Sequence, residues 1–225
     1  MPCLFKDKPR WTRRKEARPQ ELLAAALEQF VARGYAATRL EDVARQAGVS
    51  KGTLYLYFAN KEELFKAVVR ENMLPVLGEA AQMIDRFEGG GAALFREILH
   101  GWWQRVGATE LSGISKLMIA ESGNFPALAK FYHDEVIVPG KALIVRMLEH
   151  GIARGEFRPH DARHTAEAVV APMLMLMLWK HSFRACQADA VVPEDFLDHF
   201  IDLCLHGLLA GSAHSPTEPL HAKTP

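Results

Sequence analysis

The sequence predicts an all-helical protein in which an N-terminal three-helix domain is joined through a connecting helix to a C-terminal helical bundle. Apolar residues recur at helical spacing throughout residues 18–209, and no segment shows the strict alternation of a half-buried strand. Residues 38–61 read as two short helices with a glycine-containing turn between them, which is the helix-turn-helix pattern. These observations together predict the class and place the smaller domain first.

The first helix of this domain is expected to begin at Arg18 or Pro19, because proline suits the first turn of a helix. Gly34 is expected to end it. Thr38 is then a candidate N-cap for the next helix, and Glu41 follows three residues later at the spacing of a capping box.

The third helix is expected over Ser50–Tyr57. Gly48 suits the left-handed conformation with which many helices end, so it is expected to close the second helix. Ser50 is a strong N-cap for the third. In a helix-turn-helix the second of the paired helices is the one that enters the major groove of DNA.

Charge is distributed in a way that agrees with this reading. The chain has 27 Lys and Arg and 27 Asp and Glu, so its formal net charge is zero. Residues 1–70 hold 14 of the basic and 8 of the acidic residues, which leaves 13 basic and 19 acidic residues in the remainder. A basic N-terminal part followed by an acidic remainder is typical of a nucleic-acid-binding domain joined to a domain that does not bind nucleic acid.

The residues expected to contact DNA lie on the third helix or beside it: Thr38, Ser50, Lys51, Gly52, Thr53, Tyr55, Tyr57 and Lys61. Lys51 and Thr53 are expected at base edges. Thr38, Tyr55, Tyr57 and Lys61 are expected at phosphates, which position a protein without specifying a sequence. The alternative is a surface helical hairpin whose tyrosines only cover the core.

Residues 22–65 resemble the N-terminal domain of the tetracycline-repressor (TetR) family of bacterial transcriptional regulators. The resemblance rests on Ala26, Phe30, Gly34, Tyr35, Thr38, Val43, Ala44, Ala47, Gly48, Val49, Ser50, Gly52, Leu54, Tyr55, Tyr57, Phe58, Lys61, Leu64 and Phe65, whose order and spacing match throughout. It covers about a fifth of the chain, and the remainder is similar only in helical layout. Leu56 stands where many relatives carry a polar or aromatic residue, so no direct DNA contact is expected from it.

The chain divides into four predicted parts. Residues 1–17 form a basic arm that either follows the DNA backbone or stays solvated without a role. Residues 18–65 form the helix-turn-helix domain, and residues 66–210 form an effector-binding and dimerisation domain. Ser, Pro, Thr and Gly predominate after that, so residues 211–225 are expected to be disordered. Further helices are expected over residues 60–84, 92–106, 111–122, 126–154, 161–184 and 193–209.

Two apolar roles compete for the C-terminal domain. Helices 165–184 and 194–209 are hydrophobic enough for a four-helix dimer seam, with these candidate interface residues: Val170, Leu174, Leu178, Phe200, Ile201 and Leu208. The resemblance implies the same pair of helices. A pocket for a small hydrophobic effector is the other role, with these candidate lining residues: Trp102, Trp103, Met118, Phe131, Met147, Met173 and Met177. Large apolar residues of these types are also common in an ordinary hydrophobic core, which is the alternative role for each of them.

No catalytic constellation, cofactor fingerprint or metal site is expected. The candidates considered are Cys3, Cys186 and Cys204 and the pairs His160/His164 and His199/His206, none of which has the spacing of a known ligand set. Scattered cysteines in odd number indicate reduced thiols and a cytoplasmic location. The longest apolar run, residues 168–179, is too short to cross a membrane.

The resulting hypothesis is a homodimeric repressor that binds a palindromic double-stranded DNA operator and is released by a small hydrophobic effector. The alternative is a helical small-molecule carrier or enzyme with an incidental helix-turn-helix. The missing catalytic constellation argues against that alternative. Turnover of a substrate, or a lack of DNA binding at low salt, would favour it.

Overall fold

A computed structural model describes the backbone of residues 12–183, 186 and 192–210, and the side chains of these residues from Pro19 onward. The regular elements in that part of the chain are all helical, which confirms the predicted class. The α-helices are α1 (Thr12–Ala37), α2 (Leu40–Gln46), α3 (Lys51–Tyr55), α4 (Lys61–Arg86), α5 (Gly91–Trp102), α6 (Ser112–Glu121), α7 (Pro126–Tyr132), α8 (Val138–Ala153), α9 (Ala162–Leu178) and α10 (Pro193–Leu208). Three π-helical segments continue them: η1 (Trp103–Gly107), η2 (His133–Ile137) and η3 (Trp179–Phe183).

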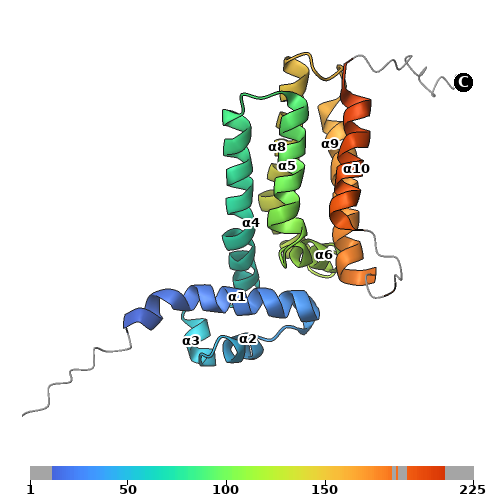
Figure 1. Cartoon of the computed structure of the whole chain (residues 1–225). Coiled ribbons are helices and arrows are strands. Elements are labelled where there is room, and N and C mark those ends of the chain that lie inside the picture. Colours follow the sequence, from blue (N-terminus) through green and yellow to red (C-terminus); the bar gives the residue numbers. More distant parts are fainter. Residues whose placement is uncertain (1–11, 184–185, 187–191, 211–225) are drawn as a thin grey trace, which may run out of the picture.

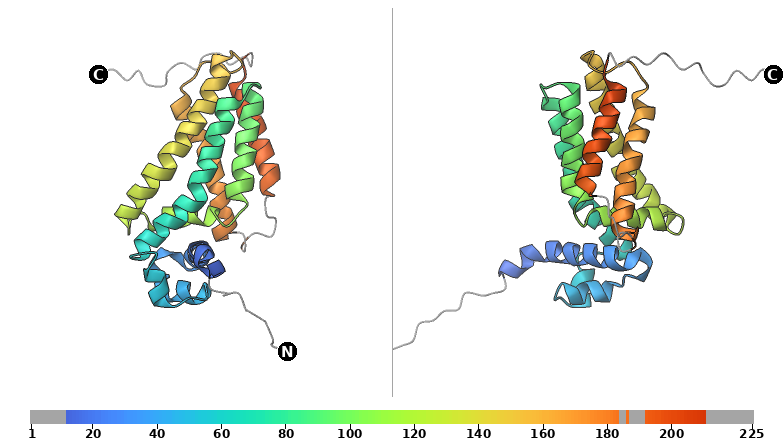
Figure 2. Two further views of the ribbon diagram at one scale, coloured as in Figure 1. Left: turned by 90° about the vertical axis from the view of Figure 1, so that its left-hand side faces the viewer. Right: turned by 45° about the vertical axis from the view of Figure 1, so that its right-hand side comes forward.

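The helices are arranged as a small lower layer beneath a taller bundle. Helices α1, α2 and α3 form the lower layer, and α4 rises from it to the far end of the bundle (Figure 1). Helices α5 and α8 stand beside α4, and α9 and α10 lie on the other side of the bundle, where α9 packs mainly on α8 and α10 mainly on α5 (Figure 1). The right-hand view of Figure 2 shows α9 and α10 next to each other. The connecting helix expected from the sequence is therefore α4.

Local capping signals set the helix boundaries of the lower layer. Gly48 has a φ of +66°, as expected of the residue that ends α2. The Ser50 hydroxyl accepts a hydrogen bond of 3.1 Å from the backbone N–H of Thr53. The Asn60 side chain does the same for the N–H of Glu63, at 2.9 Å. Each cap satisfies one of the backbone donors that a helix N-terminus leaves without an intrahelical partner.

The first helix differs from the expectation at its start. It begins at Thr12, six residues or more before the predicted start at Arg18 or Pro19. Gly34, with φ +82° and ψ +165°, interrupts its regular course as predicted, and a short turn leads on to Ala37. Residues 1–11 of the predicted arm and the predicted tail 211–225 lie outside the described residues.

The helix predicted over residues 126–154 is divided by a π-helical turn shortly before Pro139. Proline has no N–H and its ring crowds the carbonyl four residues earlier, so an unbroken α-helix through Pro139 would lose a hydrogen bond. Segment η2 lies directly before it and lets α7 continue into α8 without a break in the chain path.

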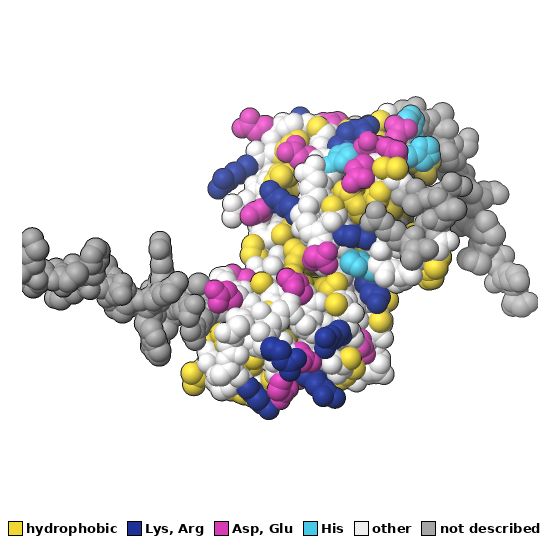
Figure 3. All heavy atoms as spheres, turned by 60° about the horizontal axis from the view of Figure 1, so that its bottom comes forward, with side chains coloured by type: hydrophobic (Ala, Val, Ile, Leu, Met, Phe, Trp, Pro, Cys, Tyr) yellow, Lys and Arg dark blue, Asp and Glu magenta, His cyan; other side chains and the backbone are white. Residues whose placement is uncertain are grey.

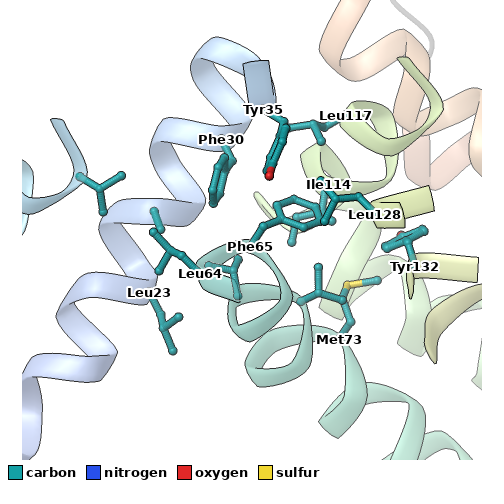
Figure 4. Packing of buried hydrophobic residues seen from close by; sticks show 14 of the residues in the cluster. Leu23, Phe30, Tyr35, Leu64, Phe65, Met73, Ile114, Leu117, Leu128 and Tyr132 are labelled. Carbon is teal, nitrogen blue, oxygen red and sulfur yellow. The ribbon is translucent and has the colours of Figure 1, made fainter. Parts of the chain in front are cut away.

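A first hydrophobic cluster, which we call the lower core, joins the lower layer to the base of the bundle. Phe30 and Tyr35 of α1 pack against Phe65 of α4, with ring centroids 5.2 and 5.6 Å from it (Figure 4). Ile114 and Leu117 of α6 close the cluster from above. The predicted domain boundary after residue 65 falls inside this cluster, so the two domains share one core.

A second cluster, the upper core, lies inside the bundle. It is built from the far half of α4 and from α5, α8, α9 and α10. Its fully or almost fully buried members include Leu94, Phe95, Leu99, Met147, Leu148, Phe157, Leu197 and Ile201. Burial of apolar area on this scale is the main source of stability for a domain of this size.

Candidate nucleic-acid interface and the apolar faces of the bundle

Helix α3 is held so that one of its faces points away from the protein. Leu54 is completely buried in the lower core and anchors the helix. Its carbonyl accepts hydrogen bonds from the N–H groups of Tyr57 and Phe58, both at 3.0 Å, which fixes the chain as it leaves α3. With one side chain anchored, the helix presents its remaining residues to solvent.

Six of the eight predicted DNA-contact residues gather on this outer surface: Ser50, Lys51, Gly52, Thr53, Tyr55 and Tyr57. Thr53 is partly buried and the other five are exposed. The Ser50 and Thr53 hydroxyls lie 2.9 Å apart and share a hydrogen bond. Hydroxyl, ammonium and phenol groups within two helical turns give this surface the donors that phosphates and base edges accept.

Lys51 is already paired in the free protein. Its ammonium forms an ion pair with Glu41 of α2 and lies 5.8 Å from the centre of the Tyr55 ring. The hydrogen bond between Lys51 and Glu41 raises the pKa of Lys51 and lowers the pKa of Glu41, because it favours the charged form of each side chain. Both side chains are about half exposed, and exposed pairs are weak, so an acceptor group of DNA can replace the carboxylate.

Thr38 lies in the interior and not on the outer surface. Its side chain is 2% exposed, and its hydroxyl donates to the carbonyls of Gly34 and Gln29 at 2.7 and 3.1 Å. It is not the cap of α2 either, since Arg39 occupies the N-cap position without a side-chain hydrogen bond. The Thr38 hydroxyl therefore stabilises the turn after Gly34 and is not part of the surface proposed to contact DNA.

Lys61 also differs from the expectation. Its ammonium donates to the carbonyls of Tyr35, Ala36 and Thr38, at 2.7, 3.1 and 3.1 Å, and lies 4.6 Å from the centre of the Tyr35 ring. Burial lowers its pKa, while the charge of Glu121 on α6 acts in the opposite direction. An ammonium has three protons, so these carbonyls use its full donor capacity. We assign Lys61 to holding the turn between α1 and α2.

Three basic residues of the lower face were not among the DNA-contact residues predicted from the sequence. Arg39 and Arg45 are exposed at the two ends of α2, and Arg33 is exposed on α1. Arg33 and Arg45 both pair with Asp42, at 3.1 and 3.0 Å. Figure 3 shows Lys and Arg side chains gathered on this face with acidic side chains among them. For Arg45, which lies off the buried face formed by Leu40, Val43 and Ala44, the helical period of α2 is the signal that would have found it.

The predicted interface residues divide between the inside and the outside of the bundle. Val170, Leu174, Leu178 and Phe200 are partly exposed on α9 and α10. The assignment of Ile201 and Leu208 to the subunit interface was wrong, because they are 0% and 6% exposed and belong to the upper core of their own subunit. Leu203, which the sequence did not single out, is 66% exposed on the outer face of α10.

The predicted pocket residues are spread over both cores. Met118 and Phe131 belong to the lower core, whereas Trp103, Met147 and Met173 belong to the upper core. Trp102 packs against both clusters, and Met177 is also buried. The Trp103 indole N–H donates to Glu194 of α10 at 3.0 Å. A common pocket therefore stays a prediction, with Trp102 at the place where the two clusters meet.

The described residues contain no group of three or more His, Cys, Asp or Glu side chains placed to hold a metal ion. Cys186 is exposed and Cys204 partly buried, while Cys3 lies outside the described residues. Burial raises the pKa of Cys204 to about 11, so its thiol stays protonated at neutral pH. Among the helices that the structure describes, none is both long and apolar enough to span a bilayer.

Comparison with known proteins gives the same two parts. Residues 22–68 match the family model described as bacterial regulatory proteins, tetR family. Residues 92–204, half of the chain, match the model of the tetracyclin repressor-like C-terminal domain.

Individual relatives are transcriptional regulators. The transcriptional repressor KstR2 of Mycolicibacterium smegmatis is 29% identical over 154 residues, which are 64% of this chain and 69% of that protein. The fatty acid metabolism regulator protein of Bacillus subtilis is 37% identical over 76 residues, 33% of this chain and 36% of the other.

The fold is also shared with solved structures. FadR of Bacillus subtilis, solved in complex with stearoyl-CoA, superimposes with a TM-score of 0.71 at 19% identity, over 87% of this chain and 99% of that one. The fold, the helix-turn-helix and the two matched domains together show that this chain belongs to the tetR family of bacterial regulatory proteins, and so is a DNA-binding transcriptional regulator.

Proposed function

We propose that the protein is a homodimeric repressor that binds a palindromic operator through α3 and is released by a small hydrophobic effector. The observation that carries the DNA-binding part is the orientation of α3, whose buried Leu54 leaves hydroxyl, ammonium and phenol groups pointing outward. Lys51 and Thr53 are assigned to base edges, and Tyr55 and Tyr57 to phosphates. A two-fold dimer presents two identical helices, so the operator is an inverted repeat.

The outer face of α9 and α10 supports a dimer. Met175 is 48% and Leu203 66% exposed there, and the partly buried Phe196 and Phe200 stack with centroids 6.4 Å apart. These side chains carry no hydrogen-bonding group that water would satisfy, so exposure is costly unless a second apolar surface covers them. Two such helices from each subunit form a four-helix seam.

The effector is assigned to the region where the two cores meet. Trp102 packs against both, and it is followed at once by η1 and then by α6. The stearoyl-CoA bound by the structurally similar FadR supports a ligand with a long apolar part. An effector that fits here separates or tilts elements of both cores, and Met and aromatic side chains adapt readily to such a ligand.

Helix α6 connects this region to the DNA-binding layer. A Cβ added at Gly113 of α6 would lie only 2.5 Å from Val31 of α1, so the two helices pack at close range. Phe125, after α6, packs edge-on against Tyr35 at 4.7 Å. A displaced α6 therefore displaces α1, and with it the spacing of the two α3 helices. Effector and operator must then weaken each other's binding by the same factor.

The decisive experiment is selection of bound sequences from a random DNA pool with the purified protein. Enrichment of an inverted repeat is expected for the natural protein, with loss of enrichment for Lys51→Ala. A panel of apolar compounds that includes long-chain acyl thioesters is then titrated against the selected DNA. Failure to enrich any sequence at low salt would favour the carrier or enzyme hypothesis instead.

A further inference from the structure

Leu56 is the most exposed large apolar side chain of the described residues. It is 83% exposed, compared with 45% for Tyr55 and 39% for Tyr57 on either side of it. It is also the C-cap residue of α3, and its N–H is hydrogen-bonded to the carbonyl of Thr53 at 3.2 Å. Its backbone is therefore fixed, although its side chain contacts water.

The position of Leu56 around the helix sets its direction. Residues two apart in a helix differ by about 200° around the axis. Leu54 points into the lower core, so Leu56 points away from it and into the surface assigned to DNA. Gly52 lies four residues earlier, on the same face of the helix. A Cβ added at Gly52 would have only the Ser50 hydroxyl within 4 Å, at 3.8 Å, so the described residues leave that face of the helix open.

The chemistry of leucine restricts what it can recognise. It offers neither a hydrogen-bond donor nor a charge, so it gains nothing from a phosphate or from the polar edges of bases. The major groove presents one distinctive apolar group, the C5-methyl group of thymine. Burial of a methyl group of the base against the leucine removes apolar area from water on both sides of the contact.

We propose that Leu56 reads a thymine methyl group in each half-site and so contributes to the sequence specificity of the protein. This inference rests on the proposed placement of α3 in the major groove. It assigns a specificity role to a position at which the sequence pattern predicted no contact. The neighbouring tyrosine hydroxyls supply phosphate contacts, which bring the leucine close to the bases without selecting among them.

The test uses the operator obtained by selection and the full-length protein. Each thymine of the half-site is replaced in turn by uracil, which lacks only the C5-methyl group, at the equivalent place in both half-sites. At one position the natural protein is expected to lose about fourfold in affinity per half-site, the amount that corresponds to one buried methyl group. Leu56→Ala is expected to bind the thymine and uracil versions of that position equally.

The matched control is Val138→Ala, which shortens an aliphatic side chain that is 48% exposed on α8. It is expected to keep the full difference between thymine and uracil. Thermal unfolding is measured for both variants, because the exposed leucine is expected to leave the fold unchanged. The proposal is overturned if no thymine shows a uracil effect in the natural protein, or if Leu56→Ala retains that effect. Failure of the proposed function itself would be recognised earlier, since no operator would be selected.

Discussion

The outer surface of α3 and the outer surface of α9 and α10 are both exposed, but they are exposed in different ways. On the α3 side several charged groups already have partners: Lys51 pairs with Glu41, and Arg45 pairs with Asp42. On the α9 and α10 side the exposed groups are apolar, including Met175 and Leu203. A paired polar surface is stable in water and can exchange its carboxylates for phosphates. An apolar surface has no such alternative and needs a lasting apolar partner.

The largest effect is expected from a charge on the apolar surface. Leu203→Arg places a guanidinium in the proposed seam and is expected to give monomers, since a buried unpaired charge is costly. Operator affinity then falls by about 100-fold or more, because two linked half-site contacts become one. Sedimentation and operator titration measure both effects. Val138→Arg, with the same change on α8, is the control. A dimeric Leu203→Arg protein would exclude this seam.

Ile201→Arg places the same charge on the buried face of α10 and so tests the difference between the two faces of this helix. Ile201 is completely buried in the upper core, so the variant is expected to unfold or aggregate before it dissociates. Urea unfolding monitored by tryptophan fluorescence separates this outcome from a folded monomer. If Ile201→Arg gave a stable folded monomer, the assignment of Ile201 to its own subunit's core would be wrong.

Lys61→Met tests whether this lysine belongs to the DNA surface or to the fold. Loss of three hydrogen bonds from a charged donor to the turn between α1 and α2 is expected to lower the free energy of unfolding by about 2 kcal/mol. The salt dependence of operator binding is expected to stay unchanged. Lys66→Met is the control on the same helix, because Lys66 pairs with Glu62 and Glu63 near the surface, and exposed pairs of this kind contribute little to stability.

Gly113→Ala tests whether the bundle and the α3 surface are coupled through α6. The added Cβ collides with Val31 of α1, so we expect a cost of about 1–3 kcal/mol in unfolding free energy and weaker operator binding. At Gly101, on α5, an added Cβ meets no atom within 4 Å. Gly101→Ala is therefore expected to be neutral or to stabilise by up to about 1 kcal/mol, with unchanged DNA binding. Equal DNA affinity for both variants would argue against coupling through α6.

The smallest effect is expected at the ion pair of the α3 surface. Glu41→Gln releases Lys51 from its ion pair in each subunit, so the ammonium no longer has to leave a carboxylate before it reaches a base edge, and operator affinity is expected to rise by about threefold. Glu149→Gln makes the same change in net charge on α8 and is expected to leave operator affinity unchanged. An unaltered affinity for Glu41→Gln would mean that the ion pair with Glu41 does not compete with the contact of Lys51 with DNA.

The sequence correctly predicted some helix ends, which depend on residues that are close together in the chain. Gly48 and Ser50 act at helix ends through contacts within a few positions, and both behave as expected. Lys61 differs from the expectation because its partners, carbonyls of the turn between α1 and α2, lie 23 to 26 residues away in the sequence and only the fold brings them close. Thr38 differs because its hydroxyl donates to the carbonyl of Gly34, four residues earlier, once the chain has turned there. That turn depends on the positive φ of Gly34, which the sequence allows but does not require.

The outer face of α10 was predicted less well for a different reason. A helix that packs on its own subunit and also on a partner has two apolar faces, and periodicity alone does not say which is which. Ile201 and Phe200 are neighbours in the sequence, yet one is completely buried and the other partly exposed. Only the position of α5 and α9 against α10 resolves the choice. Leu203 was overlooked because an isolated leucine on a helix carries no signal of its own.

The lower core has a consequence for how such a chain can change during evolution. Phe30, Tyr35 and Phe65 are covered by Ile114 and Leu117, which come roughly 50 to 90 residues later in the sequence. A recombination event that exchanged only the first 65 residues with another regulator would place foreign aromatic rings under this chain's α6. New DNA specificity is therefore acquired more readily by substitution on the outer face of α3 than by exchange of the whole N-terminal layer, unless the contacting face of α6 is exchanged with it.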